Sequence, residues 1–207
     1  MKYNPDIHHR RSIRLRGYDY SLNGMYFVTI CTQGRLRLFG DIADGEMKLN
    51  DAGRMVRATW DEIPAHYFGV EIDQFTVMPN HIHGIIKIVG APPRGCPSTN
   101  PVGATPCGCP STPCGCPDCI GQARDAGQAQ GPAPTGMSLS DVVHRFKTMT
   151  TKKYTDGVKQ NGWQPFPAKL WQRNYYEHII RDEGAYLKIA EYIQTNPQRW
   201  EEDTYHV

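Results

Sequence analysis

Apolar residues recur along this chain with two different periods, and these periods predict its secondary structure. Residues 25–33, MYFVTICTQ, are rich in β-branched and aromatic side chains and predict a strand. Residues 70–79 and 81–89 have the same character, and the Pro79–Asn80 pair between them predicts a tight turn. Shorter strands are predicted at residues 46–50 and 169–174.

Three other segments, residues 50–67, 138–155 and 182–200, carry apolar residues at helical spacing. Typical capping residues stand at their starts: Asn50 or Asp51, Ser138 or Ser140, and Asp182. The last helix is expected to stop before Pro197, because a proline disfavours helical geometry at the residue before it. Strands interrupted by a few helices indicate the α+β class, with helices packed on an antiparallel sheet.

The composition changes abruptly at residues 91–136, which consist largely of Pro, Gly, Cys, Ser and Thr. Such a segment buries too little apolar surface to offset its ordering entropy, so it predicts a low-complexity, disordered loop inserted into a single domain that spans residues 1–207. Six of the seven cysteines lie in it, at C-x-C and C-x-x-C spacings that match no regular zinc finger. A zinc-organised module remains a weaker alternative.

The 207 residues carry a net charge of only +2, but the basic residues are clustered. They form two groups, at residues 10–16 and 144–154, which are either solvated faces or phosphate-contacting surfaces. The candidate phosphate contacts are Arg10, Arg11, Arg14, Arg16, Arg145, Lys147, Lys152 and Lys153. The chain lacks an apolar run of about 18 residues and a secretory signal, so we expect no membrane span and a cytoplasmic protein.

Two histidines interrupt the apolar run FTVMPNHIHGIIKIV at residues 75–89. On a strand, His81 and His83 lie about 6.6 Å apart and share one face, so both imidazoles can reach one ion. Ile82 is expected to point into the core, and Gly84 to leave room beside the pair. Two imidazoles are an incomplete metal site, and each histidine taken alone could be an ordinary half-buried residue.

Further candidate groups lie in AEYIQTNP, where Tyr192 and Asn196 are one helical turn apart and share a face. A tyrosine hydroxyl there could attack a phosphate, and an amide oxygen could complete a metal site. The alternatives are a core tyrosine, beside Leu187 and Ile193 as expected buried neighbours, and an ordinary asparagine at a helix end.

The motifs VMPNHIHGII, WQRNYYEHIIRDE and YIQTNP, in this order, resemble those of the REP-associated tyrosine transposases, which belong to the HUH single-tyrosine superfamily. The resemblance extends to the strand YFVTICT and the helix HRFKTMTTKKY, and so covers nearly the whole chain outside residues 91–136. It implies a ferredoxin-like domain in which His81 and His83 bind a metal, Asn196 is the third ligand and Tyr192 is the nucleophile.

The same resemblance implies cleavage of single-stranded DNA near palindromic hairpins, with Mg²⁺ or Mn²⁺, through a covalent phosphotyrosine. Tyr175 and Tyr176 compete as nucleophiles or could stack on unpaired bases. Arg173 and Arg181 are candidate phosphate contacts, and the basic N-terminal region is expected to contact the hairpin or its flanks. A non-cleaving hairpin-binding protein derived from a transposase is the alternative function, and the sequence leaves a monomer and a homodimer open.

Overall fold

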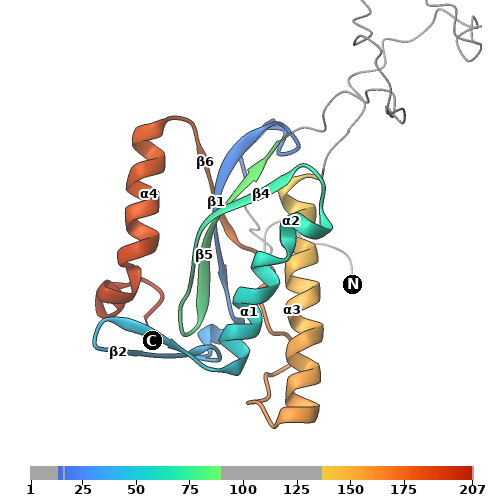
Figure 1. The fold of residues 1–207 in the computed structure, drawn as a ribbon, viewed down its shortest axis with the longest axis vertical. Helices are drawn as coiled ribbons and strands as arrows, with labels where there is room; N and C mark the ends of the chain where they lie inside the picture. Colours follow the sequence, from blue (N-terminus) through green and yellow to red (C-terminus); the bar gives the residue numbers. More distant parts are fainter. Residues whose placement is uncertain (1–13, 16, 90–136, 207) are drawn as a thin grey trace, which may run out of the picture. The chain divides into compact units, whose positions relative to one another are not determined.

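The computed structural model describes residues 14–15, 17–89 and 137–206. The predicted insert at 91–136, and also Arg10, Arg11 and Arg16, lie outside the described residues. The central element is a four-stranded antiparallel sheet with the order β4-β5-β1-β6 (Figure 1). Its strands are β1 (Gly24–Cys31), β4 (Val70–Val77), β5 (His81–Ile88) and β6 (Tyr176–Ile180).

Two helices cross between these strands and define the topology. Helix α1 (Asp51–Asp61) lies between β1 and β4 in the chain, and α3 (Leu139–Asn161) lies between β5 and β6. The order is therefore β-α-β-β-α-β, and each helix links two strands that have a third strand between them. This is the ferredoxin-like arrangement. The structure confirms the predicted α+β class and ferredoxin-like sheet.

Side chains of β5 alternate between two cores because successive residues of a strand point to opposite faces. Ile82 and Ile86 join the larger core, which also contains Trp60 of α1. Ile85 joins a smaller core with Ile193 of α4 (Glu183–Thr195). Helices α1 and α3 therefore cover one face of the sheet and α4 the other (Figure 1). Because helices cover both faces, β5 is buried along nearly its whole length, including its two histidines.

Short elements complete the described part of the chain. Strands β2 (Gly40–Ala43) and β3 (Glu46–Leu49) form a separate hairpin, and α2 (Ile63–His66) follows α1. Two 3₁₀ helices, η1 (Gln33–Arg35) and η3 (Asn196–Glu202), follow β1 and α4. Within the described ranges, none of the helices combines the length and the apolar character that crossing a membrane requires.

Three predicted helix starts are confirmed by side-chain hydrogen bonds. The Asn50 side chain accepts from the Gly53 N–H, Ser138 forms a reciprocal capping box with Asp141, and Asp182 accepts from the Ala185 N–H. Each bond satisfies a backbone donor that the first helical turn leaves without a partner.

The strand predicted at residues 169–174 is wrong, and β2 and β6 were not predicted. The segment forms one isolated bridge, between Thr32 and Trp171, and the strand begins later, at Tyr176. The apolar pair Leu170–Trp171 is nevertheless buried in the larger core. There the Trp171 indole N–H donates to the Thr150 hydroxyl at 2.8 Å. These side chains fill the core from a loop.

The expectations for Gly84 and Leu187 are also wrong. Gly84 faces away from the histidines, and a Cβ at this position would lie 2.5 Å from Trp60 Cζ2. Its missing side chain makes room for the Trp60 ring, which stacks on Phe75 at 4.4 Å between centroids. Leu187 points outward and is 58% exposed, whereas Ile193 is buried as expected.

Candidate metal and tyrosine site

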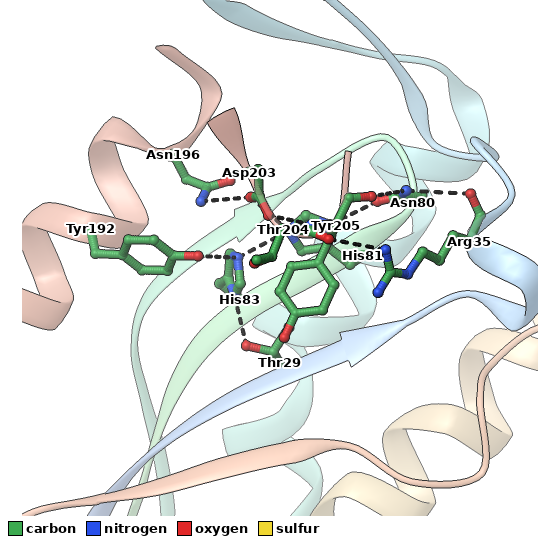
Figure 2. A network of polar contacts seen from close by, with 10 residues as sticks. All are labelled: Thr29, Arg35, Asn80, His81, His83, Tyr192, Asn196, Asp203, Thr204 and Tyr205. Atoms are coloured by element: carbon green, nitrogen blue, oxygen red, sulfur yellow. Dashed lines mark hydrogen bonds and ion pairs between the residues drawn. The ribbon is translucent and has the colours of Figure 1, made fainter. Parts of the chain in front are cut away.

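The two histidines stand at the start of β5, on the sheet face that α4 covers. Their Nε2 atoms face each other at 2.9 Å (Figure 2). Two ligands that bind one ion at right angles, each about 2.1 Å away, are about 3.0 Å apart. The spacing of the His81 and His83 nitrogens therefore suits two adjacent positions of an octahedral ion.

Hydrogen bonds behind the imidazoles orient both rings and leave the His81 Nε2 lone pair free. The Asn80 amide nitrogen donates to the carbonyls of Arg35 and Tyr205, so the Asn80 Oδ1 faces His81 Nδ1, at 2.8 Å. His81 Nδ1 must then carry the proton, and Nε2 carries the lone pair. His83 Nδ1 lies 2.8 Å from the Thr29 hydroxyl, which can either donate or accept. Such outer partners orient histidine ligands.

Asp203 is the third member of this group, and the sequence reasoning missed it. It follows η3 directly, its side chain is 2% exposed, and its Oδ2 lies 3.7 Å from His81 Nε2. One ligand atom each from Asp203, His81 and His83 lie within 4.8 Å of one another. The only sequence signal was the acidic run at 201–203, in which Glu201 and Glu202 are exposed.

Asn196 stands directly behind Asp203. Its amide nitrogen donates to Asp203 Oδ2 at 3.0 Å, while its Oδ1 is buried and has no hydrogen-bond partner among the described residues (Figure 2). A buried acceptor without a donor costs about 1–3 kcal/mol. This amide oxygen without a donor, the Asp203 carboxylate and two neutral imidazoles form a donor set that fits a divalent cation. Asn196 as a metal ligand stays a prediction.

Burial controls the protonation of these groups. It lowers the pKa of His81 to about 4, although the Asp203 carboxylate opposes the shift, and it lowers the pKa of His83 well below its ordinary value. Both imidazoles are therefore neutral near pH 7, as metal ligands must be. Burial, reinforced by the Asp203 charge, raises the pKa of Tyr192 to about 12, so its phenol keeps its proton.

Tyr192 projects from α4 toward the histidines. Its hydroxyl lies 3.4 Å from His83 Nε2, and the two ring centroids are 5.1 Å apart. The structure thus brings together four residues that the sequence proposed for the site: His81, His83, Tyr192 and Asn196. The helical spacing of Tyr192 and Asn196 places both on the face of α4 that is turned toward β5.

The adjacent tyrosines Tyr175, just before β6, and Tyr176, its first residue, lie on opposite faces of the sheet. Tyr176 lies opposite Thr29 in the β1–β6 register, is 48% exposed, and contacts Phe27 edge-to-face. It therefore shares the site face. Tyr175 packs against the core on the other face, where its hydroxyl accepts from Arg14 Nη2 at 2.9 Å. Of the two, Tyr176 is the one placed to meet a strand at the site.

The end of the described chain covers the histidines. The Tyr205 ring lies 4.8 Å from the His81 ring and 6.1 Å from the His83 ring. Arg35 holds this segment, since it donates to the Thr204 carbonyl at 3.0 Å and lies over the Tyr205 ring. As a result His81 is 0% exposed and His83 1%.

The predicted phosphate contacts of α3 lie on the opposite sheet face and have different surroundings. Lys147 donates to the carbonyls of residues 172, 173 and 174 at 2.9–3.3 Å, and burial lowers its pKa to about 8. Lys153 pairs with Glu62 at 2.7 Å, and Arg145 lies over the Tyr67 ring. The other described candidates, Arg14, Lys152, Arg173 and Arg181, are exposed, and Arg14 contacts Tyr175 and Glu177. DNA contact by these residues stays a prediction.

Fold and site define a ferredoxin-like protein with a buried His-His-Asp group beside a tyrosine. The chain is 40% identical to an uncharacterised protein of Haemophilus influenzae over 209 residues, which cover 100% of this chain and 98% of the relative. The chain belongs to the same family as that protein. No protein-family profile matches the present chain.

Two solved structures are similar to this one. A REP-associated tyrosine transposase bound to a REP hairpin is 17% identical, with a TM-score of 0.47, and the match covers 90% of this chain and 73% of the other. A candidate transposase from Deinococcus radiodurans R1 is 16% identical, with a TM-score of 0.41, and the match covers 88% and 96%. These scores are low, so the case for function rests on the residues of this chain.

Proposed function

We propose that this protein is a metal-dependent single-strand DNA endonuclease and strand transferase of the HUH single-tyrosine type. It acts on palindromic hairpin DNA through a covalent phosphotyrosine at Tyr192. The observation that carries the proposal is the Tyr192 hydroxyl, 3.4 Å from His83 Nε2 and beside the group of His81, His83 and Asp203. Neither a structural histidine pair nor a core tyrosine needs this arrangement.

His81, His83 and Asp203 would hold the ion, with Asn196 orienting Asp203 through its amide nitrogen and offering its Oδ1 as a further ligand. Mg²⁺ and Mn²⁺ both suit octahedral sites, and Mn²⁺ tolerates imidazole nitrogen better. When bound, such an ion polarises a phosphate oxygen and stabilises the negative charge that develops on it.

In the reaction, Tyr192 Oη forms a bond to phosphorus as the bond from phosphorus to the 3′ oxygen breaks. The phenol loses its proton and the departing 3′ oxygen takes one up, so that a 5′-phosphotyrosine and a free 3′-hydroxyl result. The phosphodiester energy is kept in the phosphotyrosine, and a second 3′-hydroxyl can reverse the step and join a new strand. Tyr192 meets the phosphate from α4, while Thr29 and Asn80 hold the imidazoles in place.

The motif resemblance supports a hairpin substrate, and the site face offers a place for an unpaired base beside it. Tyr176 stands exposed at the sheet edge beside the site, where an unpaired base next to the scissile phosphate can stack on its ring. A phosphate can reach the histidines only after residues 204–206 move away, because Tyr205 covers both rings. This cover also favours the second candidate, a hairpin-binding protein that does not cleave.

A denaturing gel tests the proposal. A labelled single-stranded hairpin with unpaired flanks is incubated with Mn²⁺ and with wild type, Tyr192→Phe, His81→Ala or Tyr176→Phe. A protein–DNA adduct that forms with wild type and Tyr176→Phe but with neither other variant supports the proposal. An adduct with Tyr192→Phe would show a different nucleophile. Hairpin binding without any adduct, even from a chain that ends at Asp203, would favour the non-cleaving protein.

A further inference from the structure

A cavity lies at the edge strand β6, and none of His81, His83 and Asp203 lines it. It has a volume of about 400 Å³, and Leu15, Tyr20, Glu177 and Arg181 are among its lining residues. Glu177 lies opposite Val28 in the β1–β6 register, so its side chain points to the sheet face opposite Tyr176. His178 and Ala185, which also line the cavity, belong to the face that carries the metal group, so the cavity reaches both faces at the β6 edge.

Glu177 is the unusual residue of the cavity. Its side chain is 2% exposed, and its Oε2 lies 3.7 Å from Arg14 Nε. Its Oε1 is buried and, in the part of the chain that the structure describes, no group donates a hydrogen bond to it. The Tyr20 and Tyr175 hydroxyls lie near the other side of this carboxylate, because burial and then hydrogen bonding to Glu177 and its charge raise the pKa of both phenols, while Oε1 stays without a donor. A buried carboxylate oxygen without a donor is costly, so the cavity lacks a donor group.

The surroundings of Glu177 select the kind of donor. A metal ion is disfavoured, because the Arg14 guanidinium lies beside the carboxylate and Arg181 lines the same cavity. Moreover, in ranges 14–15, 17–89 and 137–206, the one cluster suited to an ion is that of the histidine pair. The Tyr20 ring and the 50% exposed Leu15 side chain form apolar walls for a flat group. A flat group with an N–H donor is a nucleobase.

From this geometry we infer that the cavity is a subsite for an unpaired base that carries an exocyclic amino group. The amino group of adenine, cytosine or guanine donates to Glu177 Oε1, which a turn of the soft last torsion of the side chain directs into the cavity. Thymine is rejected, because its single N–H lies between two carbonyl oxygens that meet the carboxylate. Arg181 stands at the cavity to contact the adjoining phosphate. The inference rests on the proposed function, since it assumes a single-stranded DNA ligand.

Strand β6 connects the two sites. Tyr176 and Glu177 are adjacent and point to opposite faces, so a single strand that passes over the β6 edge can meet both side chains. Stacking on Tyr176 is tolerant of sequence, whereas a hydrogen bond to Glu177 depends on the base. The cavity therefore adds base selection to a site face that otherwise contacts phosphates and rings.

The test measures DNA binding in metal-free buffer, where cleavage does not occur. Fluorescence anisotropy is recorded for one hairpin whose unpaired flanks are all dA, all dC or all dT. Wild type is expected to bind the dA and dC flanks roughly tenfold more tightly than the dT flanks. Glu177→Gln, which keeps size but not charge, should bind all three within about twofold. Glu46→Gln, at a surface glutamate paired with Lys48, should keep the tenfold preference.

A second measurement needs no variant. Wild type should also prefer dA flanks, again about tenfold, over flanks of unsubstituted purine, which stacks similarly but lacks the amino group. Equal binding of these two, or an unchanged preference in Glu177→Gln, overturns the inference, as does a failure to bind any hairpin. The adduct assay separates the two proposals. An adduct without base preference supports the proposed nuclease function and refutes the base subsite. Base preference without an adduct supports the base subsite and refutes the nuclease function.

Discussion

Removal of the Tyr205 ring should accelerate the reaction of the site that it covers. The ring is held by the Arg35 guanidinium, 5.5 Å from its centroid, and by contact with the His81 ring at 4.8 Å. Exposed cation–π contacts contribute about 0.5–1 kcal/mol and aromatic pairs about 0.5–1.5 kcal/mol. Tyr205→Ala therefore weakens the closed state by about 1–2.5 kcal/mol, while the backbone bonds of Thr204 and Tyr205 remain.

This loss raises the population of the open state by about fivefold to seventyfold. If opening precedes DNA binding, the rate of adduct formation at limiting DNA should rise by the same factor. The assay is single-turnover adduct formation with saturating Mn²⁺. Tyr205→Phe keeps the ring and should react like wild type. The control Phe68→Ala removes an aromatic ring that is 74% exposed, and it should also react like wild type. An unchanged or lower rate for Tyr205→Ala would refute the idea that this residue restricts access.

Three further predictions concern the scaffold. Gly84→Ala should lower the free energy of unfolding by about 1–3 kcal/mol, because the new methyl group meets the Trp60 ring; an unchanged urea midpoint would contradict this packing. Lys147→Met should cost about 1–3 kcal/mol of stability, since three carbonyls lose their donor, without changing the salt dependence of DNA binding; a shallower salt slope would instead show a phosphate contact. The folded pKa of His81, about 4, lies below its unfolded value, so the unfolded state binds the extra proton and stability should fall as the pH drops from about 6.5 toward 4. In urea unfolding, His81→Gln should lose less free energy of unfolding between about pH 6.5 and pH 4 than wild type does. The control His144→Gln, at an exposed site, should lose as much as wild type, and an equal loss in His81→Gln would exclude His81 as the cause.

Local periodicity was sufficient for most of the scaffold. The strands around residues 25–33, 70–79 and 81–89 and the three capped helices follow from residues close together in the chain, because the hydrogen bonds and caps that stabilise them are local. The period of two in a strand also placed His81 and His83 on one face. Strand β6 was not predicted. The strand was placed at residues 169–174 instead, because Leu170 and Trp171 make that segment apolar, although it forms a loop.

The sequence predicted the candidate site only in part, because local patterns reveal residues close together in the chain but not long-range contacts. His81, His83, Tyr192 and Asn196 stand in motifs with short spacing, and the sequence alone proposed all four. Asp203 enters the group because the chain after η3 turns back over β5. A sequence pattern does not encode that long-range contact, and nothing local distinguishes Asp203 from its two exposed acidic neighbours. The Tyr205 cover, the three carbonyls bound by Lys147 and the buried Glu177 oxygen likewise depend on segments far apart in sequence. Only their packing in the tertiary structure determines which of these polar groups find partners.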